Sequence, residues 1–292
     1  MRKLFIFVAV FVVSLAILLT ACKKDDPKPD NTGNDNNQEI PGGGGGGEIT
    51  PNQEYPETAV VLPQAVTDID GNTYDAVQIG NQVWMAENLR TTKYANGTTI
   101  PLGGSTYTNE PHRFAPGPNQ SSGENMANVC RYGYLYNWSA VMQGANSSES
   151  NPSHVQGICP TGWHVPSDAE WTELINYLKT QSSYTASGNT DHLAKALAAT
   201  WGWNSTNETD APGNNPSTNN ATGFSALPAG YYYGPDDIFS DNNGFGIGAE
   251  FWSATEHNVD DARYFNIYYE YAYVSVNSYE KSSGFSVRCV RD

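Results

Sequence analysis

An apolar run near the N-terminus limits where this 292-residue chain can fold. Residues 4–19 are apolar except for Ser14, and they follow the positively charged Arg2 and Lys3. A short basic stretch followed by an apolar stretch is typical of a signal peptide. A membrane-spanning helix is the alternative, because about 20 apolar residues cross a bilayer and this run is only slightly shorter. The residues that follow the run decide between the two.

The apolar run ends at a cysteine that small residues precede. The segment Leu19-Thr20-Ala21-Cys22 resembles a lipobox, in which the cysteine thiol takes a diacylglyceryl group and cleavage makes that cysteine the new N-terminus. We therefore predict a lipoprotein signal peptide over residues 1–21 and a lipid anchor on Cys22. The following Lys-Lys-Asp-Asp at residues 23–26 resembles the signal that sends lipoproteins of Bacteroidota to the outer face of the outer membrane; the alternative is a solvated charge cluster.

A low-complexity segment separates this anchor from the rest of the chain. Residues 27–63 are rich in Asp, Asn, Pro, Gly and Gln, and residues 42–47 are six consecutive glycines. Such a segment buries too little apolar surface to offset its loss of conformational entropy. We predict a disordered tether over residues 22–64 and, because no internal repeat is evident, one globular domain over residues 65–292.

Charge and cysteine content restrict the partners of that domain. The chain has 15 lysines and arginines against 31 aspartates and glutamates, a formal net charge of −16, so nucleic acid is excluded as a partner. The carboxylates remain available for calcium. With Cys22 lipidated, three cysteines are left, at 130, 159 and 289. An oxidising compartment favours at least one disulfide among them and leaves one thiol over, and no cysteine or histidine spacing indicates zinc.

Two helices are predicted in the middle of the domain. Ser167 and Glu170 form a capping box, and the apolar residues that follow lie one helical turn apart, so the face should pack on the core: Trp171, Leu174, Ile175 and Leu178. A shorter helix is predicted from about residue 191 to 199. Residues 204–220 are predicted to be a long surface loop.

Strand patterns begin and end the domain. Residues 66–83 alternate around two turn signals and predict an antiparallel hairpin; Asp68, Asp70 and Asn72 favour a turn over a calcium loop, because no closing glutamate follows. Aromatic and β-branched runs predict strands at residues 264–269 and 271–276, and a last strand over residues 285–289. Strands at both ends with helices between them predict an α+β fold.

Several longer motifs are recognisable. The motifs resemble, in order, those of the Fibrobacter succinogenes major paralogous domain, from about Thr67 to the C-terminus: DIDGNTY at 68–74, QVWMAENL at 82–89, YGYLYNW at 132–138, CPTGWHVPS at 159–167, GFSALP at 223–228, FWSATE at 251–256 and GFSVRCVRD at 284–292.

That family is similar in plan to the C-type lectin-like fold, which the formylglycine-generating enzymes also use. The resemblance implies two main helices against twisted antiparallel sheets, with both ends of the domain in one sheet and a long irregular loop region as the ligand surface. It also implies a disulfide between Cys159 and Cys289, both inside family motifs. Cys130 lies just outside its neighbouring motif and is our candidate for the unpaired thiol.

Catalytic chemistry is not evident in the sequence, and we predict that the protein is not an enzyme. The formylglycine-generating oxidases use two nearby cysteines, whereas Cys289 has no cysteine within several residues. The five histidines are scattered, and His164, inside a family motif, is predicted to be a buried structural residue. A cryptic oxidase of the formylglycine-generating type is therefore the weakest of our alternatives.

Aromatic residues offer the best candidates for ligand binding, because Tyr and Trp rings stack on the apolar faces of sugars. Most of the aromatics belong to predicted strands, so the candidates are those between the helices and the last strands: Trp201, Trp203, Tyr231, Tyr232 and Tyr233. The acidic group Asp236, Asp237 and Asp241 could hold calcium, with an ordinary acidic loop as the alternative. The sugar-binding motifs of calcium-dependent lectins are absent, and no other cofactor is predicted.

These inferences combine into one hypothesis. The chain is predicted to be an outer-membrane lipoprotein, anchored to the membrane by its N-terminal lipid and facing the cell exterior, whose domain is a binding or adhesion module for a glycan or a surface protein. The first alternative is a structural role, as an accessory or tip subunit of a surface assembly.

Overall fold

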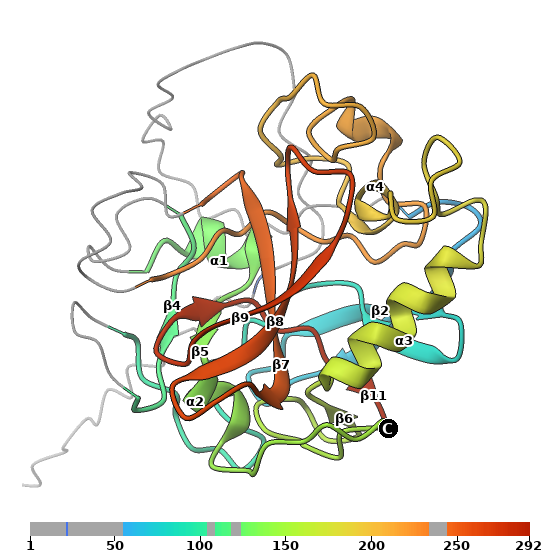
Figure 1. Cartoon of the computed structure of the whole chain (residues 1–292). Coiled ribbons are helices and arrows are strands. Elements are labelled where there is room, and N and C mark those ends of the chain that lie inside the picture. Colours follow the sequence, from blue (N-terminus) through green and yellow to red (C-terminus); the bar gives the residue numbers. More distant parts are fainter. Residues whose placement is uncertain (1–21, 23–54, 104–108, 118–123, 234–243) are drawn as a thin grey trace, which may run out of the picture.

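The computed structural model describes residue 22 and residues 55–103, 109–117, 124–233 and 244–292 (Figure 1). Among these residues, no helix has the length and apolar character needed to cross a bilayer. The described elements are mainly antiparallel strands with a few short helices, which confirms the α+β class.

One sheet joins the two ends of the domain. It contains five strands, all paired antiparallel, in the order β1 (Val60–Thr67), β2 (Thr73–Ile79), β3 (Gln82–Met85), β11 (Val290–Arg291) and β6 (Trp163–His164). Val290 near the C-terminus lies opposite both Trp84 and His164. The structure thus confirms the predicted opening hairpin and the expectation that both ends of the domain share a sheet, but β1 begins at Val60, inside the segment predicted to be a disordered tether.

Two smaller sheets complete the strand framework. The first has the order β10 (Gly284–Phe285), β5 (Leu135–Asn137) and β4 (Arg113–Phe114), and the second has the order β7 (Gly248–Glu256), β8 (Asp261–Tyr268) and β9 (Ser275–Glu280). Two strand predictions need correction. The strand expected over residues 271–276 begins only at Ser275, after the turn that follows β8, and the expected last strand is divided between β10 and β11.

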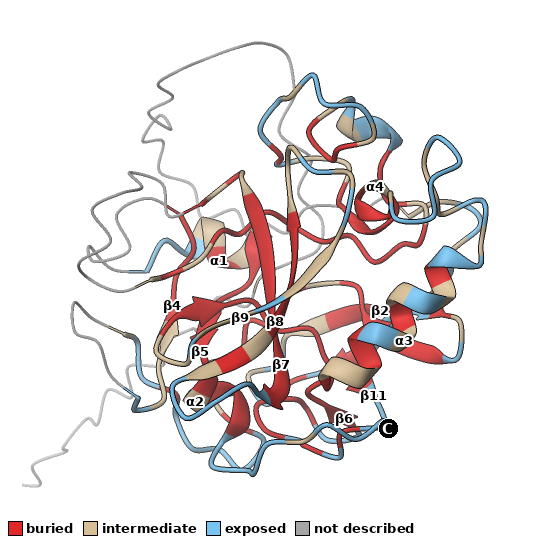
Figure 2. Ribbon diagram, in the orientation of Figure 1, coloured by how far each residue is buried: buried red, intermediate tan, exposed pale blue. Residues whose placement is uncertain are grey.

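The longest described helix, α3 (Asp168–Lys179), forms as the sequence predicts. Ser167 and Glu170 make both hydrogen bonds of the capping box. The buried face of α3 packs against β7 and β8, where the ring of Trp171 stacks on Phe265 with centroids 4.5 Å apart (Figures 1 and 2). The opposite face of α3 is exposed in Figure 2. Trp171 is therefore a core residue, as the helical spacing predicts.

The second predicted helix is much shorter than expected. It is the four-residue α4 (Ala194–Leu197), because Ala198 is already extended and forms a parallel bridge with Ala226. The amide of Ala199 donates to the carbonyl of Ala226, so the chain leaves the helix in order to pair with a distant segment. Three further short helices are present: α1 (Met126–Tyr132), α2 (Trp138–Met142) and the 3₁₀ helix η2 (Pro216–Thr218).

Two disulfides are present. Cys159 pairs with Cys289, as the family resemblance implies. Cys22 pairs with Cys130, so the prediction that Cys130 is an unpaired thiol is wrong for this structure. That prediction assumed that lipid consumes the Cys22 thiol, and with the thiol intact the four cysteines form two pairs. A lipid thioether and this disulfide use the same sulfur atom and exclude each other, so the lipid anchor on Cys22 stays a prediction.

Candidate binding site

The five aromatic residues predicted to contact ligand do not form one surface. Trp203 is only 7% exposed, and its indole nitrogen donates to the carbonyl of Ala199 at 3.0 Å. Tyr232 is 8% exposed and stacks on Phe114 with ring centroids 3.9 Å apart. Both belong to the core, which disagrees with their predicted role. Trp201 is half-buried against the ring of Tyr132.

The other two predicted tyrosines lie together on the opposite side of their segment. Side chains alternate along an extended chain, so Tyr231 and Tyr233 share the face that Tyr232 avoids. Their rings stack with centroids 3.8 Å apart, and Tyr233 stacks in turn on Tyr279 of β9 at 4.4 Å. All three rings are half-buried, so this stack is partly open to solvent.

The stack adjoins one face of the β7–β8–β9 sheet. Cross-strand pairing places Gly248 opposite Tyr268, and Glu250 opposite Asn266. Asn277 of β9 donates from its side-chain amide to the Asn266 amide oxygen at 3.1 Å. This face therefore combines rings with amides and a carboxyl. We call it the tyrosine face and define it by seven residues: Tyr231, Tyr233, Tyr264, Tyr268, Tyr279, Glu250 and Asn277.

Glu250 is an unusual member of the tyrosine face. Its side chain is fully buried, and neither carboxyl oxygen makes a well-formed hydrogen bond. Burial raises the pKa of Glu250 from 4.5 to about 8, although the hydroxyl of Tyr268 lies close enough to oppose part of that rise. Burial disfavours the charged form of a carboxyl, so Glu250 is neutral at pH 7.

The tyrosine hydroxyls keep their protons as well. Burial raises the pKa of Tyr264 to about 12, and it raises the pKa values of Tyr233 and Tyr268 further, with the nearby Glu250 adding to all three shifts. These phenols can therefore donate hydrogen bonds throughout the neutral pH range.

A glycine allows the carboxyl and a ring to close over the backbone of β7. A Cβ atom on Gly248 would lie 2.4 Å from one carboxyl oxygen of Glu250 and 2.8 Å from the ring of Tyr268. Real Cβ atoms do not approach other atoms so closely, so any larger residue would displace one of the two side chains. Gly248 thus leaves room for the Glu250 carboxyl and the Tyr268 ring side by side over its backbone.

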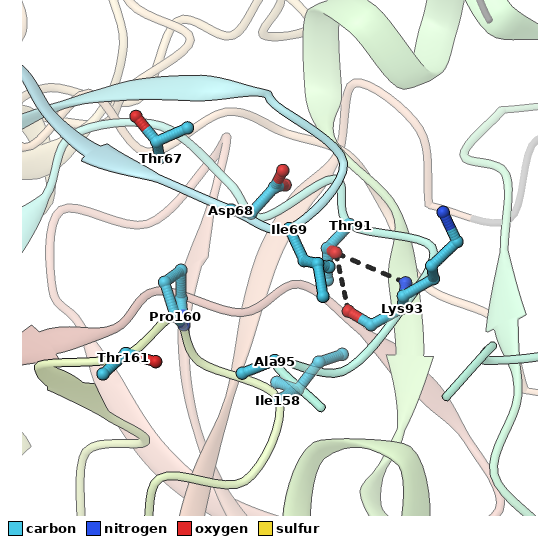
Figure 3. A pocket seen from close by; sticks show the side chains of 9 residues that line it. All are labelled: Thr67, Asp68, Ile69, Thr91, Lys93, Ala95, Ile158, Pro160 and Thr161. Carbon is cyan, nitrogen blue, oxygen red and sulfur yellow. Dashed lines mark hydrogen bonds between the residues drawn. The ribbon is translucent and has the colours of Figure 1, made fainter. Parts of the chain in front are cut away.

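A hollow lies beside the β1–β2 turn and has a volume of about 260 Å³ (Figure 3). Figure 3 shows Ile69, Ala95, Ile158 and Pro160 around it, with the ammonium of Lys93 directed away. Three of its five polar side chains are already bonded within the protein: Asp68 accepts from the backbone amides of residues 70 and 72, Thr91 donates to the carbonyl of Lys93, and Lys93 donates to Asp70. The hollow therefore offers few free polar groups to a ligand.

The predicted metal ligands Asp236, Asp237 and Asp241 lie outside the described residues. Among the residues that the structure does describe, no group of three or more His, Cys, Asp or Glu side chains could hold a metal ion. The turn at Asp68 forms as the sequence analysis favours, because its carboxylate binds the turn's own amides.

Two buried side chains, His164 and Arg288, lie inside the family motifs and make hydrogen bonds that hold the core together. His164 is 2% exposed and contacts Glu170 through one ring nitrogen and Asp292 through the other, both at 2.7 Å. Burial alone would lower the pKa of His164, but the hydrogen bonds to these two carboxylates raise it. His164 is thus the buried structural histidine that the sequence analysis expects.

The second group, Arg288, was not anticipated. It is fully buried and donates to Asn88 and to the carbonyl of Met85 in one motif, and to the carbonyls of Phe224 and Ser225 in another. Burial lowers the pKa of Arg288 to about 9. An arginine between the apolar residues Val287 and Cys289 of the last motif was the available signal for such a role. Arg288 ties three distant motifs into one core.

Comparison with known proteins identifies the family of the chain. The model of the Fibrobacter succinogenes major domain matches residues 77–291, which is more than half of the chain. The chain belongs to this family. The matched range of this Fibrobacter succinogenes major domain contains Arg288 and both of its partner motifs. It also contains all seven residues of the tyrosine face. No curated protein and no solved structure matches the chain.

Proposed function

We propose that this Fibrobacter succinogenes major domain is a non-enzymatic binding module of the cell surface, and that its tyrosine face binds glycans. The leader and the lipobox at Cys22 support an outer-membrane lipoprotein that faces outward. The net charge of −16 supports a partner other than nucleic acid. A C-type lectin-like architecture remains part of this proposal, on the strength of the motif resemblance.

The stack of Tyr231, Tyr233 and Tyr279 is the single observation that carries the proposal. A sugar ring presents an apolar face to an aromatic ring and hydroxyls at its edge, and the tyrosine face offers both kinds of partner. Asn277 provides an exposed amide beside the rings, and protonated phenols provide donors. A pocket is not needed for such binding, because an extended glycan can lie along a row of rings.

A glycan array tests the proposal directly. The full-length protein, purified in detergent, is applied with calcium and, separately, with a chelator, because a role for calcium at Asp236, Asp237 and Asp241 is part of the hypothesis. We expect binding that the substitutions Tyr231→Ala and Tyr233→Ala reduce at least tenfold. The matched control is Tyr273→Ala, which removes an exposed ring from the turn between β8 and β9, away from the stack.

The outcome also separates glycan binding from a structural role. An array without signal, together with a surface protein that co-purifies with the chain and is lost in the Tyr231→Ala variant, would reject glycan binding and support an accessory subunit of a surface assembly. Glycan binding that Tyr231→Ala and Tyr233→Ala both retain, as the control Tyr273→Ala does, would show that the tyrosine face is not the binding site.

A further inference from the structure

The tyrosine face contains one residue that packing alone does not explain. Glu250 is fully buried in β7, between the apolar residues Ala249 and Phe251. Both of its carboxyl oxygens lack a well-formed hydrogen bond. A buried polar group without a partner is unfavourable, and a leucine or methionine of similar size would avoid this penalty. The carboxyl therefore points to a partner that the isolated chain does not contain.

The groups that face Glu250 indicate the chemistry of that partner. The ionisable side chains that interact with it are tyrosines: Tyr233 from the segment before β7, and Tyr264 and Tyr268 from β8. Tyr231 and Tyr279 extend the same set through ring stacking. The faces of aromatic rings attract cations, and a carboxylate without a counter-ion does so more strongly. Negative ring faces around an unpaired carboxyl favour a cationic ligand group.

Resting on the binding role proposed above, we propose that the tyrosine face recognises ligands that carry a protonated amino group, with Glu250 as its counter-ion. An amino sugar within a glycan has the required chemistry. Tyr268 is half-buried and lies beside Gly248 together with the Glu250 carboxyl, and rotation of a partly exposed side chain is fast enough to admit the amino group. The net negative charge of the chain also attracts a cationic ligand.

Binding of this kind changes the protonation of Glu250. In the free protein the carboxyl is neutral at pH 7, because burial holds its pKa at about 8. Below its own pKa, the ligand amine already carries its proton. On binding, the O–H bond of Glu250 breaks, the proton passes to the buffer, and the carboxylate forms an ion pair with the ammonium group. One proton is therefore released for each amine bound at a pH below the pKa values of both the amine and Glu250, and affinity rises with pH as long as the amine stays protonated.

Two oligosaccharides of equal length test the inference: a β-1,4-linked glucosamine tetramer and its fully N-acetylated counterpart. Calorimetry of the full-length protein at pH 5.5, where both the sugar amine and Glu250 carry their protons, measures affinity and proton release together when it is run in two buffers of different ionisation enthalpy. We expect the amine to bind at least tenfold more tightly than the acetylated sugar, with release of nearly one proton. The Glu250→Gln variant should lose both the preference and the proton release.

Controls separate this inference from loss of the fold and from failure of the proposed function. Glu280→Gln removes an exposed carboxylate from the neighbouring β9 and should behave as the wild type. Unfolding of Glu250→Gln at pH 4, where Glu250 is protonated in both the folded and the unfolded chain, should match that of the wild type. Equal affinity for both sugars, or a preference that Glu250→Gln retains, would overturn the amine inference while leaving tyrosine-dependent glycan binding intact. The absence of detectable binding by either tetramer would also overturn the amine inference. The glycan array would then test separately whether the tyrosine face binds glycans.

Discussion

The buried carboxyl of Glu250 makes the stability of the domain depend on pH in a way that one substitution should remove. Its pKa is 4.5 in the unfolded chain and about 8 in the folded protein, because burial disfavours the carboxylate. Between these two values the folded state holds a proton that the unfolded state has lost. The free energy of unfolding therefore falls as pH rises through this window.

The size of the effect follows from the two pKa values. Each unit of difference corresponds to about 1.36 kcal/mol, so the contribution of Glu250 decreases by roughly 5 kcal/mol between pH 4.5 and pH 8. No discount for solvent screening applies, because the side chain is fully buried. Below pH 4.5 both states are protonated, and above pH 8 both are ionised, so the contribution of this group is constant outside the window.

Urea unfolding at a series of pH values between 4 and 9, with the disulfides intact, measures this effect. Subtracting the wild-type free energy from that of Glu250→Gln cancels the other titrating groups. We expect the variant to gain about 1.4 kcal/mol relative to the wild type for each pH unit inside the window. The exposed Glu280→Gln should give a difference that does not change with pH. Parallel wild-type and Glu250→Gln curves would show that Glu250 ionises normally and would refute the argument.

Three further predictions concern the framework. Arg288→Met leaves four buried acceptors without their donor, at about 1–3 kcal/mol each, so unfolding should become easier by at least about 4 kcal/mol, while the exposed Arg291→Met should change little; equal effects would refute the role of Arg288. An unreduced digest should contain a Cys159–Cys289 peptide, and a dominant Cys130–Cys159 link would contradict the pairing. Chain that keeps its leader should contain a Cys22–Cys130 peptide, whereas lipidated chain should expose a Cys130 thiol to alkylation; a lipidated chain with a protected Cys130 would require another partner for it.

Local signals in the sequence were sufficient for some elements of the fold. The capping box of Ser167 and Glu170 and the spacing of Trp171 and Leu174 predict α3, because a helix start and an amphipathic face depend on neighbouring residues. Turn signals likewise predict the opening hairpin. The Cys159–Cys289 pairing came from the family resemblance, and the structure confirms it.

Long-range contacts account for what the sequence did not predict. The helix expected at residues 191–199 ends early because Ala198 pairs with Ala226, which no local pattern reveals. Trp203 and Tyr232 become core residues because Ala199 and Phe114 lie beside them in the fold. Cys130 was assigned as unpaired because Cys22 was assumed to be lipidated, an assumption about processing rather than about folding.

Glu250 shows a signal that was present but not used. Glu250 is the acidic residue in the buried part of β7, between the apolar Ala249 and Phe251, where a buried strand ordinarily carries none. Such a residue must be paired, neutral or functional, and the sequence alone does not distinguish these cases. The structure does, because it shows a buried carboxyl without a well-formed hydrogen bond, surrounded by tyrosines.

The distribution of roles between motif and non-motif residues explains why membership of the family does not identify a ligand. Arg288, His164 and the Cys159–Cys289 pair lie inside the recognisable motifs, and their contacts connect those motifs to one another. Tyr231, Tyr233 and Glu250 lie outside the motifs. Residues that hold the framework together can therefore stay the same while the tyrosine face changes its rings and its carboxyl. Substitutions at Tyr231, Tyr233 and Glu250 should therefore alter ligand preference without loss of the fold. Substitutions at Arg288 should destabilise the fold, whichever ligand the protein binds.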